Sequence, residues 1–261
     1  MKELAYLIGP FIGEIEWEFY RFAPYIINLK KLHPECKFII YTRPSRFDLY
    51  GKYADILVPL NLKNDEELIK EYFSIKYFDI VKYNILIKYL FKKYTKRYQI
   101  IKHLYPDIEI WRRRIKWQFP RNEMDYDFKP RRKNTEIIGS LFDSTNSVFI
   151  CPYDSEIRHT VYNYNYEPIM LDWVQDIVKN QNDGLSCSFI GCVIEILKEC
   201  SFVVGSMSSS VSKLALLLKI PVISINEKMD YDSISLLNPF NIPVINCENI
   251  EEGIEIYEDN F

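Results

Sequence analysis

The stretch from Cys200 to Asn226, CSFVVGSMSSSVSKLALLLKIPVISIN, constrains the fold of this chain more than any other. An apolar run of β-type residues ends at Gly205, a cluster of serines follows, and the next apolar residues repeat at spacings of three and four. Pro221 then precedes a second apolar run, Val222 to Ile225. This order predicts a strand, a loop, a helix and a second strand, which is the repeating unit of a parallel sheet.

The serine cluster lies where a parallel sheet usually binds its ligand. Ligands bind at the carboxyl ends of the strands, and a helix start offers N–H groups and the positive end of its dipole to an anion. The serines could equally serve only to cap the helix, and this segment leaves both interpretations open. If the loop binds a phosphate or a sugar, its ligands are Gly205, Ser206, Ser208, Ser209 and Ser210.

The amino-terminal part repeats the same pattern. Ala5 to Ile8 predicts a buried strand, a glycine-containing loop follows, and Glu14 to Lys31 has a helical period. Lys37 to Tyr41 and Ile56 to Pro59 predict two further strands, separated by a loop at Thr42 to Tyr53. The acidic loop before the helix therefore opens at the carboxyl edge of a parallel sheet.

The middle of the chain is strongly basic. Between Lys88 and Lys133 there are 15 Lys and Arg against 5 Asp and Glu, a charge of +10 within a chain whose net charge is −3. The pattern from Asn64 to about Tyr105 is helical, whereas Trp111 to Lys133 has no clear period and predicts an irregular connection. We interpret 64–133 as a basic helical insert.

The α/β pattern resumes after this insert. These two halves predict an α/β protein with two Rossmann-like domains facing a cleft, 1–133 with the insert and 134–261. The elements expected in the second half, besides those of the serine stretch, are a strand at Val148–Cys151, loops at Tyr153–Thr160 and Tyr162–Glu167, a helix at Met170–Asn180, a strand at Ser188–Ile190, a helix at Gly191–Cys200, a strand at Ile242–Asn246 and a helix at Ile250–Tyr257.

Composition excludes several classes of protein. An apolar fraction of 48% and an aromatic fraction of 15% exclude a disordered chain. Glutamates interrupt the amino-terminal apolar residues, and no run reaches the roughly 18 apolar residues of a membrane span. We therefore expect a soluble, cytoplasmic protein.

Cysteine and histidine usage limits the chemistry. The six cysteines show no C-x-x-C spacing, which predicts reduced core residues, and three histidines leave little room for a His-based metal site or a Ser-His-Asp triad. We expect carboxylates to carry any acid–base chemistry. A D-x-D pair occurs only as Asp125-Tyr126-Asp127, inside the connection rather than after a strand, so we expect no metal.

Two stretches resemble the heptosyltransferase-type glycosyltransferases. LIGPFIGEIEWEFYRFAPYIINLKKLHPECKFIIY is similar to their amino-terminal signature, and CSFVVGSMSSSVSKLALLLKIPVISI is similar to their donor-binding segment. The resemblance implies a GT-B architecture, with the acceptor held by the amino half and the nucleotide-sugar by the carboxyl half. It places Glu14 at the family's loop aspartate, the general base. Ser208, Ser209, Ser210 and Lys213 stand where the family has Asp, Thr, Gly and His, so the sugar stays open.

The residues present fit an inverting, metal-independent sugar transfer. Direct displacement at an anomeric carbon needs a carboxylate near the acceptor hydroxyl and positive or N–H groups on the departing diphosphate. Glu14 can supply the carboxylate, and Arg158 and Lys213 with the helix start after Gly205 can bind the diphosphate. Asp154 and Glu156 are candidates for binding ribose or sugar hydroxyls.

The basic insert indicates the acceptor. Its cations alternate with aromatic residues, a mixture that suits phosphate neutralisation and base stacking and also suits an anionic membrane surface. The small size and split charge resemble compact viral (phage) glycosyltransferases that modify hydroxymethylated DNA bases, so DNA is our preferred acceptor. A lipid-linked or surface glycan acceptor, a solvated helix without a partner, and a non-catalytic nucleotide- or sugar-binding protein remain alternatives. The candidate acceptor ligands are Arg43, Arg46, Arg112, Arg113, Arg114 and Trp117.

Overall fold

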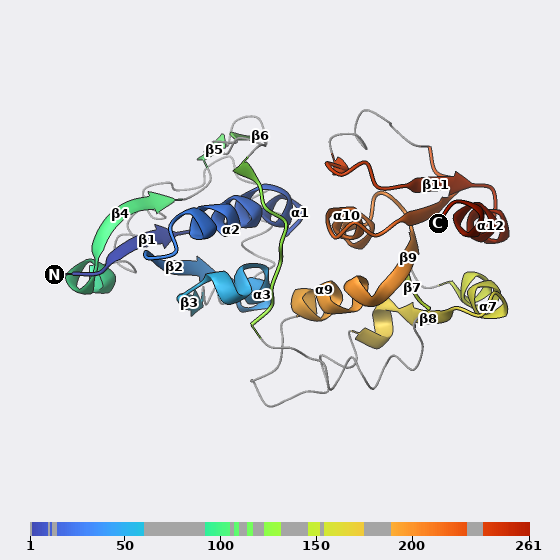
Figure 1. Cartoon of the computed structure of the whole chain (residues 1–261), viewed down its shortest axis with the longest axis horizontal. Helices are drawn as coiled ribbons and strands as arrows, with labels where there is room; N and C mark the ends of the chain where they lie inside the picture. Colours follow the sequence, from blue (N-terminus) through green and yellow to red (C-terminus); the bar gives the residue numbers. More distant parts are fainter. Residues whose placement is uncertain are drawn as a thin grey trace. The chain divides into compact units, whose positions relative to one another are not determined.

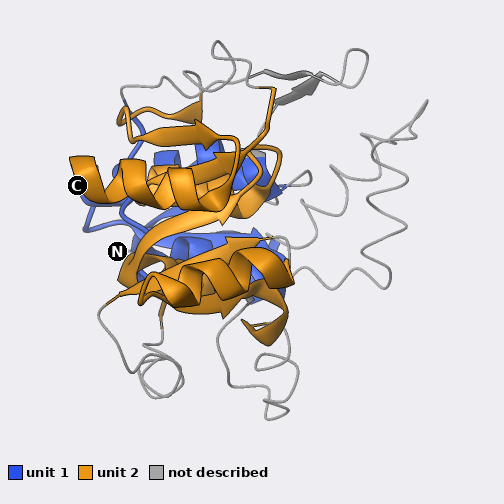
Figure 2. Ribbon diagram, turned by 90° about the vertical axis from the view of Figure 1, so that its right-hand side faces the viewer, with its two compact units in different colours: residues 1–129 blue, residues 130–261 orange. Residues whose placement is uncertain are grey.

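The computed structural model divides the chain into two compact units, residues 1–129 and 130–261 (Figures 1 and 2). The boundary expected from the sequence lies after residue 133. The structure describes residues 2–9, 11, 15–59, 92–104, 107–109, 114–116, 123–131, 146–151, 154–174, 189–228 and 237–261.

Unit 1 is built on a parallel four-stranded sheet with the order β3-β2-β1-β4. Side chains on both faces of β1 and β2 are buried, as expected for a parallel sheet covered on two sides. A short antiparallel pair, β5 with β6, follows β4. The strands are β1 (Leu4–Ile8), β2 (Lys37–Thr42), β3 (Ile56–Pro59), β4 (Gln99–Leu104), β5 (Asp107–Glu109) and β6 (Arg114–Lys116).

The helical segment after β1 contains a π-helical turn. Helix α1 (Ile15–Trp17) passes through η1 (Glu18–Phe22) into α2 (Ala23–Leu32). Pro24 lacks an N–H to donate to the carbonyl four residues earlier, and the Tyr126 hydroxyl donates to that carbonyl, on Tyr20, at 3.2 Å. The helix expected at 14–31 is therefore present over 15–32, with a local change of pitch.

Two expectations for unit 1 were wrong. The loop expected at Thr42–Tyr53 forms three short helical turns, η2 (Pro44–Arg46), α3 (Phe47–Tyr50) and η3 (Gly51–Tyr53). The helix expected to reach about Tyr105 gives way to β4, because this segment pairs with β1 and its Ile100 packs with Leu7 and Ile39. Residues 92–97 are helical, while 60–91, most of the expected insert, lie outside the described residues.

Unit 2 is built on a parallel five-stranded sheet with the order β11-β10-β9-β7-β8. Helices α7 and α12 pack over Val148, Phe202 and Ile223 on one face of this sheet, and Figure 1 shows α9 and α10 on the other face. The elements are β7 (Ser147–Cys151), α7 (Ser155–Asn163), β8 (Glu167–Met170), α9 (Phe189–Glu199), β9 (Cys200–Gly205), α10 (Ser210–Leu217), β10 (Val222–Ile225), β11 (Val244–Cys247) and α12 (Ile250–Asn260).

Three expectations for unit 2 were also wrong. The loop expected at Tyr153–Thr160 contains most of α7, whose start is capped by the Asp154 carboxylate. The loop expected at Tyr162–Glu167 contains the end of α7 and the first residue of β8, and the strand expected at Ser188–Ile190 contains the start of α9. Short apolar runs do not distinguish strand from helix, which explains the last error.

The α/β class with two parallel-sheet units is nevertheless confirmed. Cys36, Cys151, Cys192, Cys200 and Cys247 are free and buried, as expected for reduced core cysteines. Within the described part of the chain, no helix has the length and apolar character needed to cross a membrane.

Candidate functional site

The sheet of unit 2 has a topological switch point between β7 and β9. These strands are neighbours, with Cys151 paired to Gly205 at their carboxyl ends. The chain continues from β7 into α7 on one face and from β9 into α10 on the other (Figure 1). Two connections that diverge to opposite faces leave a crevice at the sheet edge, and parallel α/β sheets bind their ligands in such crevices. The serine cluster lies directly beside this point.

Gly205 allows β7 and β9 to approach at the switch point. A Cβ on Gly205 would lie 2.4 Å from the Cys151 carbonyl oxygen and 2.8 Å from the Ser212 Oγ, so no side chain fits without movement. Ser209 caps α10 by accepting a hydrogen bond from the Val211 N–H at 3.2 Å, and its Oγ lies 3.5 Å from the Cys151 Sγ. The capping interpretation of Ser209 is thus confirmed; capping does not prevent a ligand role.

Glu227 is a member of this site that the sequence analysis missed. Its carboxylate accepts hydrogen bonds from the Ser206 hydroxyl at 2.9 Å, the Met207 N–H at 2.6 Å and the Ser224 hydroxyl at 2.5 Å. Asn246 holds its backbone, accepting from the Glu227 N–H at 3.2 Å and donating to the Glu227 carbonyl at 2.9 Å. A carboxylate two residues after an expected strand was the available signal.

The environment of Glu227 keeps it ionised. Burial raises the pKa of its carboxyl, but the hydrogen bonds from Ser224, from the Met207 N–H and from Ser206 outweigh burial, and the pKa lies below its usual value. Glu227 therefore adds a negative charge beside the serine turn.

The start of α7 carries the remaining candidate donor ligands. Asp154 accepts hydrogen bonds from the N–H groups of Glu156 at 2.9 Å and Ile157 at 3.1 Å, which makes it the N-cap. Glu156 and Arg158 are exposed, and the Arg158 guanidinium lies 5.1 Å from the centre of the Trp173 ring. Trp173 follows β8 and keeps 38% of its surface exposed. Sequence analysis missed this aromatic partner.

Unit 1 has its own switch point, between β1 and β4. The Gly9 N–H donates to the Leu104 carbonyl at 2.7 Å, and the His103 Nε2 lies 3.0 Å from the Gly9 carbonyl oxygen. Gly9 has a φ of +82°, and a Cβ there would lie 2.3 Å from the Tyr41 carbonyl oxygen, so glycine is required. Glu14, the expected general base, lies outside the described residues.

A buried charge network follows this point in unit 1. Glu18 is fully buried and accepts hydrogen bonds from Arg46 at 2.5 Å, Tyr50 at 2.5 Å and Thr42 at 3.2 Å. Burial, followed by the Glu18 charge, raises the pKa of Tyr50 well above its usual value, so the phenol remains a donor. The network joins the π-helical turn to the end of β2 and the turns after it. Sequence analysis missed Glu18 as a buried group.

The expected acceptor ligands are only partly described. Arg43 and Arg46 keep 4% and 5% of their surface exposed, and Arg46 pairs with Glu18 inside unit 1. Arg112, Arg113 and Trp117 lie outside the described residues, and only the backbone of Arg114 is described. The acceptor role of these residues stays a prediction.

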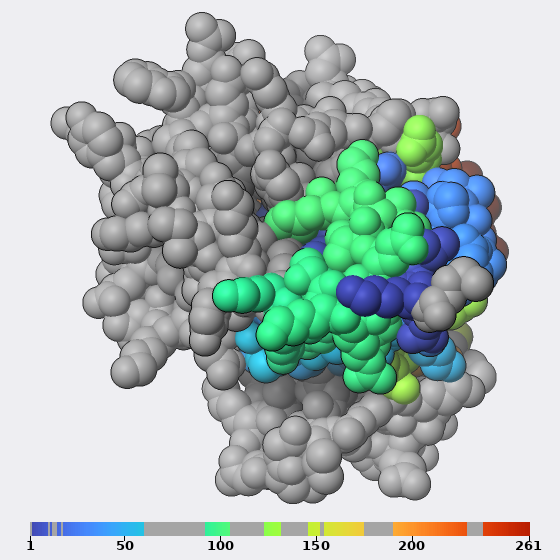
Figure 3. Space-filling model, turned by 90° about the vertical axis from the view of Figure 1, so that its left-hand side faces the viewer, coloured from blue at the N-terminus to red at the C-terminus, as the bar shows by residue number. Residues whose placement is uncertain are grey.

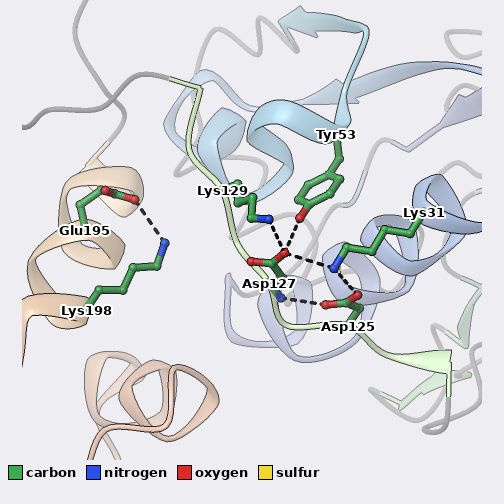
Figure 4. Close-up of polar contacts among 7 residues, drawn as sticks. All are labelled: Lys31, Tyr53, Asp125, Asp127, Lys129, Glu195 and Lys198. Carbon is green, nitrogen blue, oxygen red and sulfur yellow. Dashed lines mark hydrogen bonds and ion pairs between the residues drawn. The ribbon is translucent and has the colours of Figure 1, made fainter. Parts of the chain in front are cut away.

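The D-x-D carboxylates are bound by protein side chains (Figure 4). Lys31 contacts Asp125 at 2.6 Å and Asp127 at 3.1 Å, and Asp127 also accepts from Tyr53 and Lys129, both at 2.8 Å. Burial raises the pKa of Asp127, but the hydrogen bonds from Lys129, Tyr53 and Lys31 lower it to about 2. Two ammonium groups thus pair with these carboxylates, Lys31 with both and Lys129 with Asp127.

Another group of side chains could bind a metal ion. One ligand atom each from His33, Glu35 and Cys36 lies within 4.8 Å of the others. These residues join the end of α2 to the start of β2, at the amino edge of the sheet and away from the switch point. The sequence analysis did not single them out.

A basic surface covers the described part of the insert. It consists of five exposed cations on 92–97 and β4, namely Lys92, Lys93, Lys96, Arg97 and Lys102. Figure 3 shows residues 92–104 gathered on one face of the molecule beside the first residues of the chain. No acidic residue occurs between 92 and 104, so the charge of this surface is uncompensated along the segment.

Comparisons with known proteins find similarity in structure alone. No protein-family model matches the chain, and no curated protein matches it. The E. coli heptosyltransferase WaaC with ADP is similar over 99% of this chain and 100% of that chain, with 13% identity and a TM-score of 0.50. A glycosyl transferase family 9 structure from Veillonella parvula is similar over 99% of this chain and 91% of that chain, with 10% identity and a TM-score of 0.48.

A third similar structure is the E. coli ADP-heptose LPS heptosyltransferase II, which matches over 86% of this chain and 84% of that chain, with 12% identity and a TM-score of 0.45. The likeness to WaaC shows the fold of the chain, two α/β units of the GT-B type.

Proposed function

We propose that this protein is a glycosyltransferase that moves a sugar from a nucleotide-diphosphate sugar to an acceptor hydroxyl. The observation that carries the proposal is the switch point at Cys151 and Gly205, with a serine turn and a helix start on one side and Arg158 on the other. N–H groups and a guanidinium can bind the diphosphate of a nucleotide-sugar, and hydroxyls can bind the hydroxyls of its ribose or sugar.

The proposed reaction is a direct, inverting displacement. The acceptor oxygen forms a bond to the anomeric carbon, the bond from that carbon to the diphosphate breaks, and the acceptor proton passes to the Glu14 carboxylate. The nucleoside diphosphate leaves as an anion, which Arg158, Lys213 and the start of α10 stabilise. Binding of Asp125 and Asp127 by lysines supports a metal-independent reaction.

For the acceptor we propose a hydroxymethylated pyrimidine in DNA. The basic surface supports a polyanion, because five exposed cations without an acidic neighbour in the segment suit repeated phosphates. Reaction at a base would require the nucleotide to leave the duplex stack. A lipid-linked or surface glycan is the alternative acceptor, and it requires anionic headgroups at the same surface.

A transfer assay tests the proposal. The protein is incubated with UDP-, ADP- and GDP-sugars, with and without hydroxymethylated DNA, unmodified DNA and anionic vesicles that carry a polyprenyl phosphate. We expect sugar to be transferred only to hydroxymethylated DNA, with and without EDTA, and with inversion at the anomeric carbon. Glu14→Gln should lower the transfer rate about 10²- to 10⁴-fold. Transfer only to the lipid in the vesicles would show that the acceptor is lipid-linked and not DNA. Sugar release without any acceptor would indicate an epimerase-like or hydrolytic reaction, and no turnover with intact binding would indicate a binding protein.

A further inference from the structure

Glu227 sets the direction of a chain of hydroxyl hydrogen bonds in the serine turn. Ser206 has one hydroxyl hydrogen, and the only stable use of it is donation to the Glu227 carboxylate, 2.9 Å away. The Ser206 oxygen also lies 2.7 Å from the Ser208 oxygen and 3.0 Å from the Ser208 backbone nitrogen. Because the Ser206 hydrogen is committed, both contacts must be donated by Ser208.

In this arrangement the Ser208 hydroxyl can accept a hydrogen bond from a ligand but has no hydrogen left to donate to one. Its hydroxyl hydrogen points to Ser206, and the side chain is exposed at the carboxyl edge of the sheet. Ser208 therefore presents an acceptor to the crevice. A diphosphate oxygen is also an acceptor, so it cannot bond to this hydroxyl without breaking the chain of hydrogen bonds.

The position of Glu227 is held by the backbone around it. Asn226 has a φ of 49°, in the left-handed region that Asn tolerates, and it turns the chain back over the end of β10. The Asn226 N–H donates to the Cys247 carbonyl at 2.9 Å, and its side chain donates to the Glu248 carbonyl at 2.8 Å. These bonds tie the end of β10 to the end of β11, and the Glu227 carboxylate ties β10 to the serine turn after β9.

We propose that Ser208 determines specificity by accepting a hydrogen bond from a hydroxyl group of the donor, with Glu227 as the positioning residue that fixes this polarity through Ser206. The inference rests on the proposed function, and it assigns different parts of the donor to the serine turn and to the start of α10. Ser208 recognises a hydroxyl of the ribose or the sugar ring, whereas the diphosphate is left to the start of α10. Beneath this start the fully buried Ser212 hydroxyl has no hydrogen-bond partner within the described structure, 2.8 Å from the Cβ position of Gly205.

Replacement of Glu227 by glutamine would reverse the chain of hydrogen bonds. The oxygen of the glutamine would keep the site that takes two donors, the Met207 N–H and the Ser224 hydroxyl, and its amide nitrogen would face Ser206. Ser206 would then accept from the amide and donate to Ser208, whose own hydrogen would point into the crevice. Shape is retained while Ser208 changes from an acceptor to a donor.

The test is isothermal titration of the wild type, Ser208→Ala and Glu227→Gln with UDP-glucose, ADP-glucose, the corresponding nucleoside diphosphates and inorganic pyrophosphate. We expect Ser208→Ala to weaken binding of the nucleotide-sugar about two- to tenfold and to leave pyrophosphate binding unchanged within about twofold. Glu227→Gln is expected to weaken binding of the nucleotide-sugar to the same extent without weakening binding of pyrophosphate. Ser201→Ala, at the opposite end of β9, is the matched control and should change neither.

The arms of this experiment separate the outcomes. If Ser208→Ala weakens binding of both the nucleoside diphosphate and the nucleotide-sugar, the hydroxyl that Ser208 recognises belongs to the ribose. If it weakens binding of the nucleotide-sugar alone, that hydroxyl belongs to the sugar. Equal weakening of pyrophosphate by Ser208→Ala, or no effect on any ligand that the wild type binds, overturns the inference and leaves the proposed function standing. Failure of the wild type to bind any nucleotide-sugar rejects both. If Glu227→Gln lowers the unfolding midpoint too far for titration, Ser208→Ala alone decides.

Discussion

Cys151 and Gly205 pair at the carboxyl ends of neighbouring strands, and the chain leaves them toward opposite faces of the unit 2 sheet. This relationship makes the switch point at which we propose that the donor binds. It also explains why the position after Val204 has no side chain, since a Cβ there would meet the Cys151 carbonyl.

Gly205→Ala should therefore disturb both the sheet and the site. The added methyl group would lie 2.4 Å from a backbone oxygen, which cannot move as a side chain can. We expect a loss of about 1–3 kcal/mol in the free energy of unfolding, together with weaker nucleotide-sugar binding. Urea denaturation and titration measure the two effects. A variant with unchanged stability and affinity would contradict the close approach of β7 and β9.

Arg46→Ala should destabilise unit 1 strongly. The change leaves the fully buried Glu18 carboxylate without its ion-pair partner, and breaking a buried pair costs about 3–5 kcal/mol. The control is Lys198→Ala, which removes the more exposed pair with Glu195 shown in Figure 4 and should cost less than about 1 kcal/mol. If Arg46→Ala weakened acceptor binding without loss of stability, the buried pair would not be its main role.

The Asp127 cluster should make stability depend on acid pH. The pKa of Asp127 is about 2 in the folded chain, whereas an unfolded aspartate titrates at about 3.9, so the unfolded chain binds the proton first. The stabilisation is present above the unfolded value and is lost as the pH falls through about 2. We expect Asp127→Asn to flatten the decline in urea midpoint between about pH 5 and pH 2. The same decline in variant and wild type would argue against the lysine contacts.

Arg158→Ala and Lys213→Ala should weaken donor binding while the fold remains intact. Arg158 is exposed on α7 and Lys213 is half-buried on α10, so neither change opens a cavity in the core of unit 2. Loss of a charged hydrogen bond to the diphosphate should weaken nucleotide-sugar binding about tenfold or more. Lys198→Ala serves again as control for a cation in the same unit. Unchanged affinity in both variants would remove these residues from the donor site.

The basic surface should make DNA binding depend on salt. Each phosphate contact adds close to one unit to the slope of log affinity against log salt. The double variant Lys96→Ala and Arg97→Ala should reduce that slope by about 2 and weaken binding to all DNA sequences alike. Fluorescence anisotropy with short duplexes between 50 and 200 mM salt measures the slope. A flat response in the wild type would count against a nucleic-acid acceptor.

Local sequence signals accounted for the framework of the fold. Apolar runs ended by Gly9 and Gly205 predicted β1 and β9, and the spacing of Leu214 and Leu218 after the serines predicted α10, because these elements depend on neighbours in the chain. Local signals failed at Gln99–Leu104, where pairing with the distant strand β1 favours a strand, and at Ser188–Ile190, where a short apolar run did not distinguish strand from helix.

The sequence by itself determined where polar loops follow strands, and thus that the turn after Val204 is a place to look for a ligand. Only the tertiary structure decided which charged side chains of each unit are already held by other residues of the protein. Glu18 with Arg46, Asp127 with Lys31, and Glu227 with Ser206 are each separated along the chain by at least 21 residues. The first and third pairs form because parallel strands bring distant loops to one sheet edge, and the second forms because the connection after β6 packs against the end of α2. No local pattern encodes such proximity.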